Sequence, residues 1–160
     1  MRKFAKYSIL SLFVYYHALL NGSNVATQTV TFSVDRISEI AISGDPFPMI
    51  TTQACAGEHP ADIFDETSFY AVTTNGTSEK VVACLNFPMP FGTMLSIMVG
   101  APNGAVSTGP VWLNTSNQNV VTGIGQVAQS SLPILYAFES SAEAGVIPLS
   151  SRIVTFTLSP

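Results

Sequence analysis

The chain has 160 residues, of which 47% are hydrophobic and only 10% are charged, and its net formal charge is −4. Three of the six basic residues, Arg2, Lys3 and Lys6, lie at the extreme N-terminus, so ten acidic residues face only three basic ones in the rest of the chain. This balance excludes nucleic-acid binding, which needs a basic patch, and electrostatic attraction to an anionic membrane surface. The length suits a single domain.

Residues 1–26 have the organisation of a secretion signal. A positive segment, Met1–Lys6, precedes thirteen mostly apolar residues, Ser8–Leu20, and then small polar residues. Thirteen residues are too few to cross a bilayer as a helix, which needs roughly 20. We expect cleavage after Ala26, or alternatively after Ser23, and a protein exported to the periplasm, the cell surface or the medium without membrane insertion. An uncleaved anchor or a buried helix is the competing interpretation.

From residue 27 onward, apolar residues recur with a period of two, which is typical of half-buried strands. The first predicted strand is Thr29–Val34, in which Val30, Phe32 and Val34 alternate with Thr and Ser. Further strands are predicted, in chain order, at Ile37–Ser43, Ser68–Thr74, Ser78–Leu85, Thr93–Val99, Val111–Leu113, Val120–Ser130, Leu132–Glu139 and Ser151–Leu158.

Glycine and proline separate these strands. Gly44–Pro48 contains two prolines that end the second strand, and Asn75-Gly76 between two β-rich runs predicts a tight hairpin. Gly123-Ile-Gly125 lacks the rest of a dinucleotide-binding motif and is predicted to be a turn or bulge. With about eight strands and no convincing helix, residues 27–160 are predicted to form a single antiparallel β-sandwich of the immunoglobulin-like kind, with a small closed barrel as the competing shape.

Cys55 and Cys84 are the two cysteines of the chain. An even number of cysteines in an exported protein favours a disulfide, which would tie the long connection after the second strand to a later strand. The bond would be structural, with about 3–4 kcal/mol of stabilisation in the loop-entropy model. Two separate thiols are the alternative if the protein resides in a reducing cytosol.

The long connection also carries an acidic cluster with one imidazole. Its members are Glu58, His59, Asp62, Asp65 and Glu66. Carboxylates with a histidine can hold Ca²⁺ or Zn²⁺, but the spacing matches no known metal motif, and solvated charges are the expected state. We therefore predict no metal and no cofactor.

No catalytic motif stands out. His59 is the single histidine after residue 26, and no serine lies in a G-x-S-x-G sequence, so a hydrolytic triad is not indicated. The aromatic residues fall mostly at period-two positions, where core packing is the expected role, and Trp112 is the best candidate for partial exposure on a carbohydrate-binding face. These are Phe32, Phe69, Tyr70, Phe87, Phe91, Trp112, Tyr136, Phe138 and Phe156. We expect a protein that is not an enzyme.

Several segments resemble those of small exported bacterial β-sandwich proteins of the spore-coat-like and pilin-like kind. The resembling segments are Thr29–Val34, Ile40–Gly44, Tyr70–Gly76 and Val154–Leu158. The resemblance implies a role in surface assembly or adhesion. The chain departs from pilins at its C-terminus, where Leu158-Ser-Pro160 stands in place of a penultimate aromatic residue, and no functional residue is carried over.

These features favour a non-enzymatic structural or interaction protein of the cell surface or secreted space. Thr29–Val34 or Ile153–Leu158 could lie at a sheet edge and pair by strand addition with another copy or with another envelope protein. A monomeric extracellular module that binds carbohydrate or metal is the alternative, and a secreted hydrolase of unrecognised type is a third.

Overall fold

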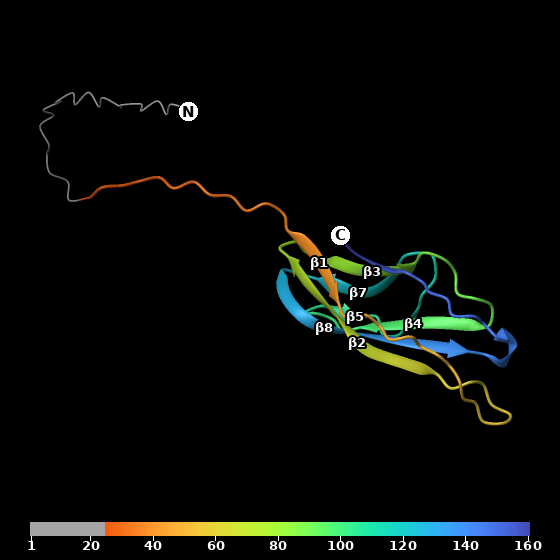
Figure 1. Cartoon of the computed structure of the whole chain (residues 1–160). Coiled ribbons are helices and arrows are strands. Elements are labelled where there is room, and N and C mark those ends of the chain that lie inside the picture. Colours follow the sequence, from red (N-terminus) through yellow and green to blue (C-terminus); the bar gives the residue numbers. More distant parts are fainter. Residues whose placement is uncertain (1–24) are drawn as a thin grey trace, which may run out of the picture. The chain divides into compact units, whose positions relative to one another are not determined.

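The structure is a computed structural model that describes residues 25–160 (Figure 1). The predicted signal at residues 1–26 therefore lies almost entirely outside the described residues. Residues 35–160 form one compact unit, and residues 25–34 belong to a second unit.

The 35–160 unit is built from nine strands and one short 3-10 helix, Ala142–Ala144. The strands are β1 (Ser38–Ser43), β2 (Ile63–Thr74), β3 (Glu79–Leu85), β4 (Thr93–Val99), β5 (Val106–Ser107), β6 (Val111–Trp112), β7 (Gln118–Ile124), β8 (Val127–Ser140) and β9 (Val154–Ser159). The first sheet has the order β1-β2-β8-β4-β6 and the second β5-β7-β3-β9, with every neighbouring pair antiparallel. The predictions of an all-β chain and of two antiparallel sheets, as in a β-sandwich, are confirmed.

The period-two pattern places one apolar row of each strand between the sheets. In β4, Leu95, Ile97 and Val99 are buried while Met94 and Met98 are exposed on the other face, as alternation in a strand requires. β4 begins and ends at the predicted residues. The buried apolar cluster comprises Tyr70, Val72, Val81, Ala83, Leu85, Leu95, Ile97, Val99, Leu113, Val120, Val121, Ile124, Leu132, Ile134 and Tyr136.

The hairpin predicted at Asn75-Gly76 is wrong, because β2 belongs to the first sheet and β3 to the second. Asn75 uses its side chain to hold the residues before β1: Nδ2 donates to Asp35 O (2.8 Å), and Oδ1 accepts from Ile37 N (2.8 Å). A Cβ at Gly76 would lie 2.5 Å from Glu79 Oε1. The Asn-Gly pair therefore turns the chain from one sheet to the other around the Glu79 side chain.

β1 ends at Ser43, and the glycine that follows it is required for a steric reason. Gly44 has φ +80°, and a Cβ there would collide with the main-chain oxygen of Thr67 in β2, so only glycine fits this close approach. The two prolines that follow, Pro46 and Pro48, lack the N–H needed to continue the ladder. The chain consequently leaves the sheet but stays beside the first half of β2, where Phe47 N donates to Asp65 Oδ2 (3.2 Å).

The predicted strand Val120–Ser130 is two strands in different sheets. β7 ends at Ile124, and β8 begins at Val127 and continues through the region predicted as a separate strand at Leu132–Glu139. The pairing of β3 with β7 is irregular between Glu79 and Val81, opposite Gly123, which has φ +71°. The prediction of a turn or bulge at Gly123–Gly125 is confirmed.

Residues 25–34 contain no strand, so the strand predicted at Thr29–Val34 is not formed. The alternating side chains of Val30, Phe32 and Val34 are 74%, 87% and 78% exposed. The segment has the composition and alternation of a half-buried strand, but the described residues give it no sheet neighbour.

Candidate binding groove at the open side of the sandwich

β1 and β9 are the edge strands on the same side of the sandwich, and each has one free edge, with which no other strand of residues 25–160 pairs. Asn86 N donates to Ile153 O (3.1 Å), and Leu85 N points away from β9 to Asn114 O (2.8 Å). Because hydrogen-bonded and non-hydrogen-bonded pairs alternate in an antiparallel ladder, the main-chain groups of Val154, Phe156 and Leu158 face the free edge of β9. We call the region between these two edges the open side.

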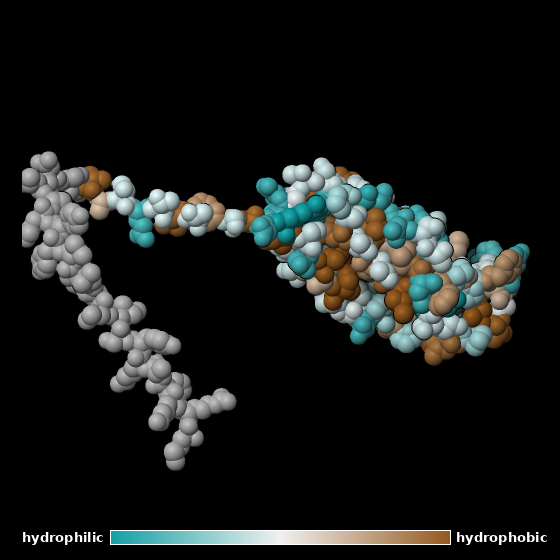
Figure 2. Space-filling model, turned by 90° about the horizontal axis from the view of Figure 1, so that it is seen from above, coloured by the Kyte–Doolittle hydropathy of each residue, from teal (hydrophilic) through white to brown (hydrophobic). Residues whose placement is uncertain are grey.

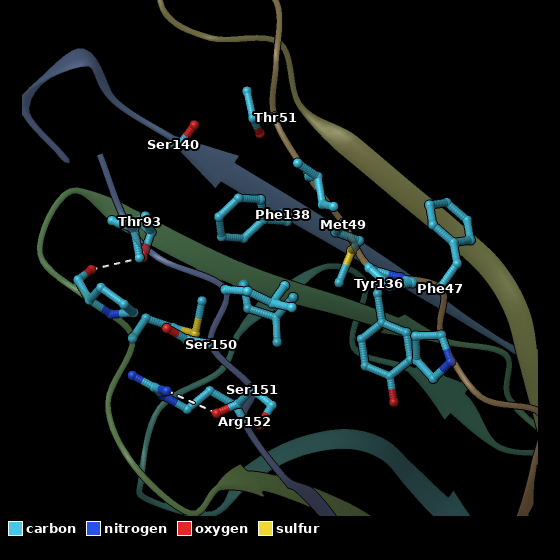
Figure 3. Close-up of a pocket in the computed structure, with 18 of the residues that line it drawn as sticks. Phe47, Met49, Thr51, Thr93, Tyr136, Phe138, Ser140, Ser150, Ser151 and Arg152 are labelled. Carbon is cyan, nitrogen blue, oxygen red and sulfur yellow. Dashed lines mark hydrogen bonds between the residues drawn. The ribbon is translucent and has the colours of Figure 1, made fainter. Parts of the chain in front are cut away.

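An apolar cavity of about 920 Å³ lies between the two sheets at the open side. The first sheet contributes Leu95, Tyr136 and Phe138 to its wall, and β9 contributes Val154 and Phe156. Met49 and other residues of the connection after β1, together with residues 147–152, complete the lining. Figure 3 shows Met49, Tyr136 and Phe138 on one side and Ser150, Ser151 and Arg152 on the other. This volume is in the upper part of the range of ligand pockets.

The apolar row of β9 is incompletely covered beside this cavity. Val154, Phe156 and Leu158 point toward the core, yet all three are only partly buried. The corresponding row of the central strand β4 is buried almost completely. Exposed apolar residues, including Ile50 and Leu149, also stand among the lining residues. The open side therefore has room for further apolar side chains.

Two hydroxyl groups of the cavity lining lack a hydrogen-bond partner among the described residues. They are Thr51 Oγ1 and Ser68 Oγ, and Ser68 is only 1% exposed. Buried hydroxyls without a partner cost free energy.

The wall beside β2 is held in place by a buried carboxylate. Asp65 is 1% exposed and accepts bonds from Phe47 N and from both the N–H (3.1 Å) and Oγ1 (2.9 Å) of Thr67. Burial, and secondly the charge of Asp65, raise the pKa of Tyr136 to about 12. Asp65 thus fixes the connection after β1 against the sheet.

The remaining acidic residues of the long connection do not gather around Asp65. Asp62 and His59 line a second cavity, of about 660 Å³, with Glu139, whose pKa is raised by burial and by the charge of Asp62. His59 Nδ1 accepts a 3.4 Å bond from Ala142 N. Within residues 25–160, no three His, Cys, Asp or Glu side chains come together as metal ligands would.

The predicted Cys55–Cys84 disulfide is absent, and both cysteines are free. Cys84 alternates with the buried residues Ala83 and Leu85 in β3, so it points to the outer face of the second sheet. Cys55 is exposed on the connection that follows the edge of the first sheet. The disulfide prediction is wrong because the connection does not lie over the outer face of β3.

The prediction that most aromatic residues fill the core is wrong, whereas the exposure of Trp112 is confirmed at 52%. Cross-strand pairing places Phe64, Ala137, Ser96 and Trp112 in one row across the outer face of the first sheet. Figure 2 shows apolar residues, in brown, interrupting the polar surface. The exposed aromatic residues of the predicted set are Phe32, Phe69, Phe87, Phe91 and Trp112.

The sequence pointed to the strands that form the open side but not to the cavity. Its walls come from residues about 100 positions apart, such as Met49 and Arg152, and no local pattern connects them. Among the described residues, no helix has the length and hydropathy needed to span a membrane. Comparison with protein-family models, with curated proteins and with solved structures finds no match for this chain.

Proposed function

We propose that this protein is a non-enzymatic structural or interaction protein that binds an extended polypeptide segment at the open side of its sandwich. The observation that carries the proposal is the apolar cavity beside the free edge of β9. A free edge offers main-chain hydrogen bonds to an added strand, and adjacent apolar pockets accept its alternate side chains.

The same proposal includes an immunoglobulin-like strand arrangement, export directed by residues 1–26 and a location on the cell surface or in the secreted space. It rests on the signal-like N-terminus and on the resemblance to small surface β-sandwich proteins.

The experiment is a calorimetric titration with an octapeptide of alternating threonine and valine, flanked by lysines for solubility. The titrated protein carries Phe32→Asp, so that its own exposed Phe32 does not compete. We compare this protein with two further versions that add Val154→Pro or Val154→Ala. Proline removes an N–H that faces the free edge, whereas alanine keeps it.

We expect the peptide to bind the Phe32→Asp protein and its Val154→Ala version, and to bind the Val154→Pro version at least tenfold more weakly, because edge pairing depends on that N–H. Circular dichroism checks that all three proteins are folded. Absence of binding, or equal binding with Val154→Pro, would overturn the proposal.

Carbohydrate binding is a second candidate, favoured by two exposed aromatic side chains, Phe64 and Trp112, at the two ends of one cross-strand row on the outer face of the first sheet. Flat aromatic surfaces can stack on sugar rings with their apolar faces. Retention of the protein on insoluble cellulose or chitin, and loss of retention after Trp112→Ala or Phe64→Ala, would support this candidate. Equal retention of all three proteins would exclude it for these polysaccharides.

A further inference from the structure

We infer that the segment accepted at the open side is Thr29–Val34 of a second copy of this chain, which adds to the free edge of β9 with Phe32 beside Phe156. This inference rests on the proposed function and names its partner. Assembly would then be head-to-tail, because each copy provides one segment and accepts another.

The first argument is a short sequence repeat, which occurs once near each end of the described residues. Thr29-Val-Thr-Phe-Ser-Val34 and Ile153-Val-Thr-Phe-Thr-Leu158 share Val-Thr-Phe and continue with a hydroxyl residue and an aliphatic one. In Ile153–Leu158, the side chains of Val154, Phe156 and Leu158 pack against the core cluster. The N-terminal segment is therefore chemically equivalent to a strand that this sandwich already accepts.

The second argument is the exposure of the segment itself. Val30, Phe32 and Val34 are all more than 70% exposed, with no charge, proline or glycine between Thr29 and Val34. An exposed, alternating and uncharged six-residue segment with high β propensity is a strong candidate for pairing with another strand. Burying its apolar row would remove this surface from water.

The third argument is the match of register and chemistry at the acceptor edge. Every strand pair in the two sheets is antiparallel, so we place the added strand antiparallel to β9. Setting Phe32 opposite Phe156 puts Val34 opposite Val154, at the cavity wall. The same register places Asp35 of the incoming copy opposite Ile153 and Arg36 opposite Arg152, so the match at this edge is one of apolar side chains and main-chain groups and not of charge. The main-chain groups that face outward from Val154 and Phe156 then gain partners.

The fourth argument explains why the donor is a second copy. Residues 35–37 join the segment to β1. Those residues are held by Asn75, which bonds both Asp35 O and Ile37 N, and by Arg36, whose Nη2 lies 2.7 Å from Glu79 Oε1. These contacts hold the three residues in place, which limits the ways in which the segment can fold back on its own chain, so we assign the donor to a second copy.

The experiment uses full-chain variants in matched pairs, measured by native mass spectrometry. Phe32→Asp disables the donor, and Ser33→Asp places the same charge on the other face of the segment as its control. Val154→Pro disables the acceptor edge, and Val154→Ala is its control. Wild type, Ser33→Asp and Val154→Ala should form oligomers of several copies, whereas Phe32→Asp and Val154→Pro should each be monomeric.

Mixing the two disabled proteins provides the decisive result. Val154→Pro still offers an intact segment and Phe32→Asp still offers an intact edge, so the mixture should form one-to-one dimers and nothing longer. A monomeric wild type, a monomeric mixture, or equal assembly by Phe32→Asp and Ser33→Asp would overturn the inference. If the Phe32→Asp protein then still binds the threonine–valine peptide, the proposed function stands with a different partner. If it does not, both fail.

Discussion

Replacing Glu79 by Gln is expected to lower the free energy of unfolding by roughly 1.5–3 kcal/mol near neutral pH, the usual contribution of hydrogen bonds to a charged group. Glu79 is fully buried at the corner between the sheets, where Oε1 accepts a 2.7 Å bond from Arg36 Nη2 and Oε2 a 3.2 Å bond from Ser38 Oγ. Glutamine keeps the shape of the side chain but removes its charge. The perturbation is therefore electrostatic and leaves no cavity.

A double-mutant cycle with Arg36→Met isolates the ion pair. At the 2.7 Å separation of Arg36 Nη2 and Glu79 Oε1, two unit charges attract by about 1.5 kcal/mol in bulk water and about 6 kcal/mol at an effective dielectric constant of 20. The Arg36 side chain is 57% exposed, which screens the pair, and burial of the carboxylate has a desolvation cost. We expect a coupling energy near the lower value, about 1–2 kcal/mol.

The effect should depend on pH in a defined direction. Burial acts to raise the pKa of Glu79, but hydrogen bonds from Arg36, Thr74 and Ser38 and the charge of Arg36 outweigh it and lower the pKa below its ordinary value. A lowered folded-state pKa stabilises the protein above the unfolded-state pKa of about 4.3, and this stabilisation is lost as pH falls through the folded-state value. The difference between wild type and Glu79→Gln should therefore shrink in acid.

Urea unfolding followed by circular dichroism measures all four proteins of the cycle, near neutral pH and below about pH 4. Additive effects of the two substitutions, within about 0.5 kcal/mol, would refute the coupling. A difference that stays constant in acid would refute the assignment of a lowered pKa to Glu79.

Three further predictions follow from single contacts. Gly44→Ala should lower the free energy of unfolding by about 1–3 kcal/mol, since alanine is strained at φ +80° and collides with the main chain of β2; an unchanged melting temperature would contradict this. Tyr70→Phe should cost about 1–2 kcal/mol in urea unfolding, because it leaves Gly100 O without the 2.6 Å bond from the tyrosine hydroxyl, and a neutral effect would place that bond in doubt. Cys55 and Cys84 should both react with a thiol reagent in denatured protein prepared without reductant. If neither cysteine reacts, the two are joined in a disulfide and this prediction is wrong.

Local periodicity was enough to locate most strands, because the alternation of apolar and polar residues records which face of a strand is buried. β4 matches its prediction at both ends, and β1 and β9 begin or end within a few residues of theirs. Their boundaries were readable because Gly44 and the prolines after it act within a few residues. Trp112 was identified as exposed for a similar reason, since it follows Gly109-Pro110 in a very short strand.

The tertiary structure alone decided which strands are neighbours. Asn75-Gly76 has the local signal of a hairpin, yet the side-chain bonds of Asn75 to residues before β1 turn the chain between sheets. Residues 120–130 read as one strand, yet Ile124 and Val127 belong to different sheets. The disulfide prediction failed because the number of residues between Cys55 and Cys84 does not indicate the face of the sheet to which Cys84 points.

The candidate site at the open side was likewise decided by the tertiary structure alone. Which edges stay free, and what lies between them, depends on sheet order, and sheet order is a non-local property of the folded chain. The amino-acid sequence by itself determined that Thr29–Val34 and Ile153–Leu158 have the pattern of strands with one apolar face. Only the tertiary structure decided that Ile153–Leu158 pairs with β3 and keeps a free edge beside a cavity, while Thr29–Val34 keeps its apolar face exposed. The reason is that main-chain hydrogen bonds form, and apolar side chains are buried, between segments that lie far apart in the chain.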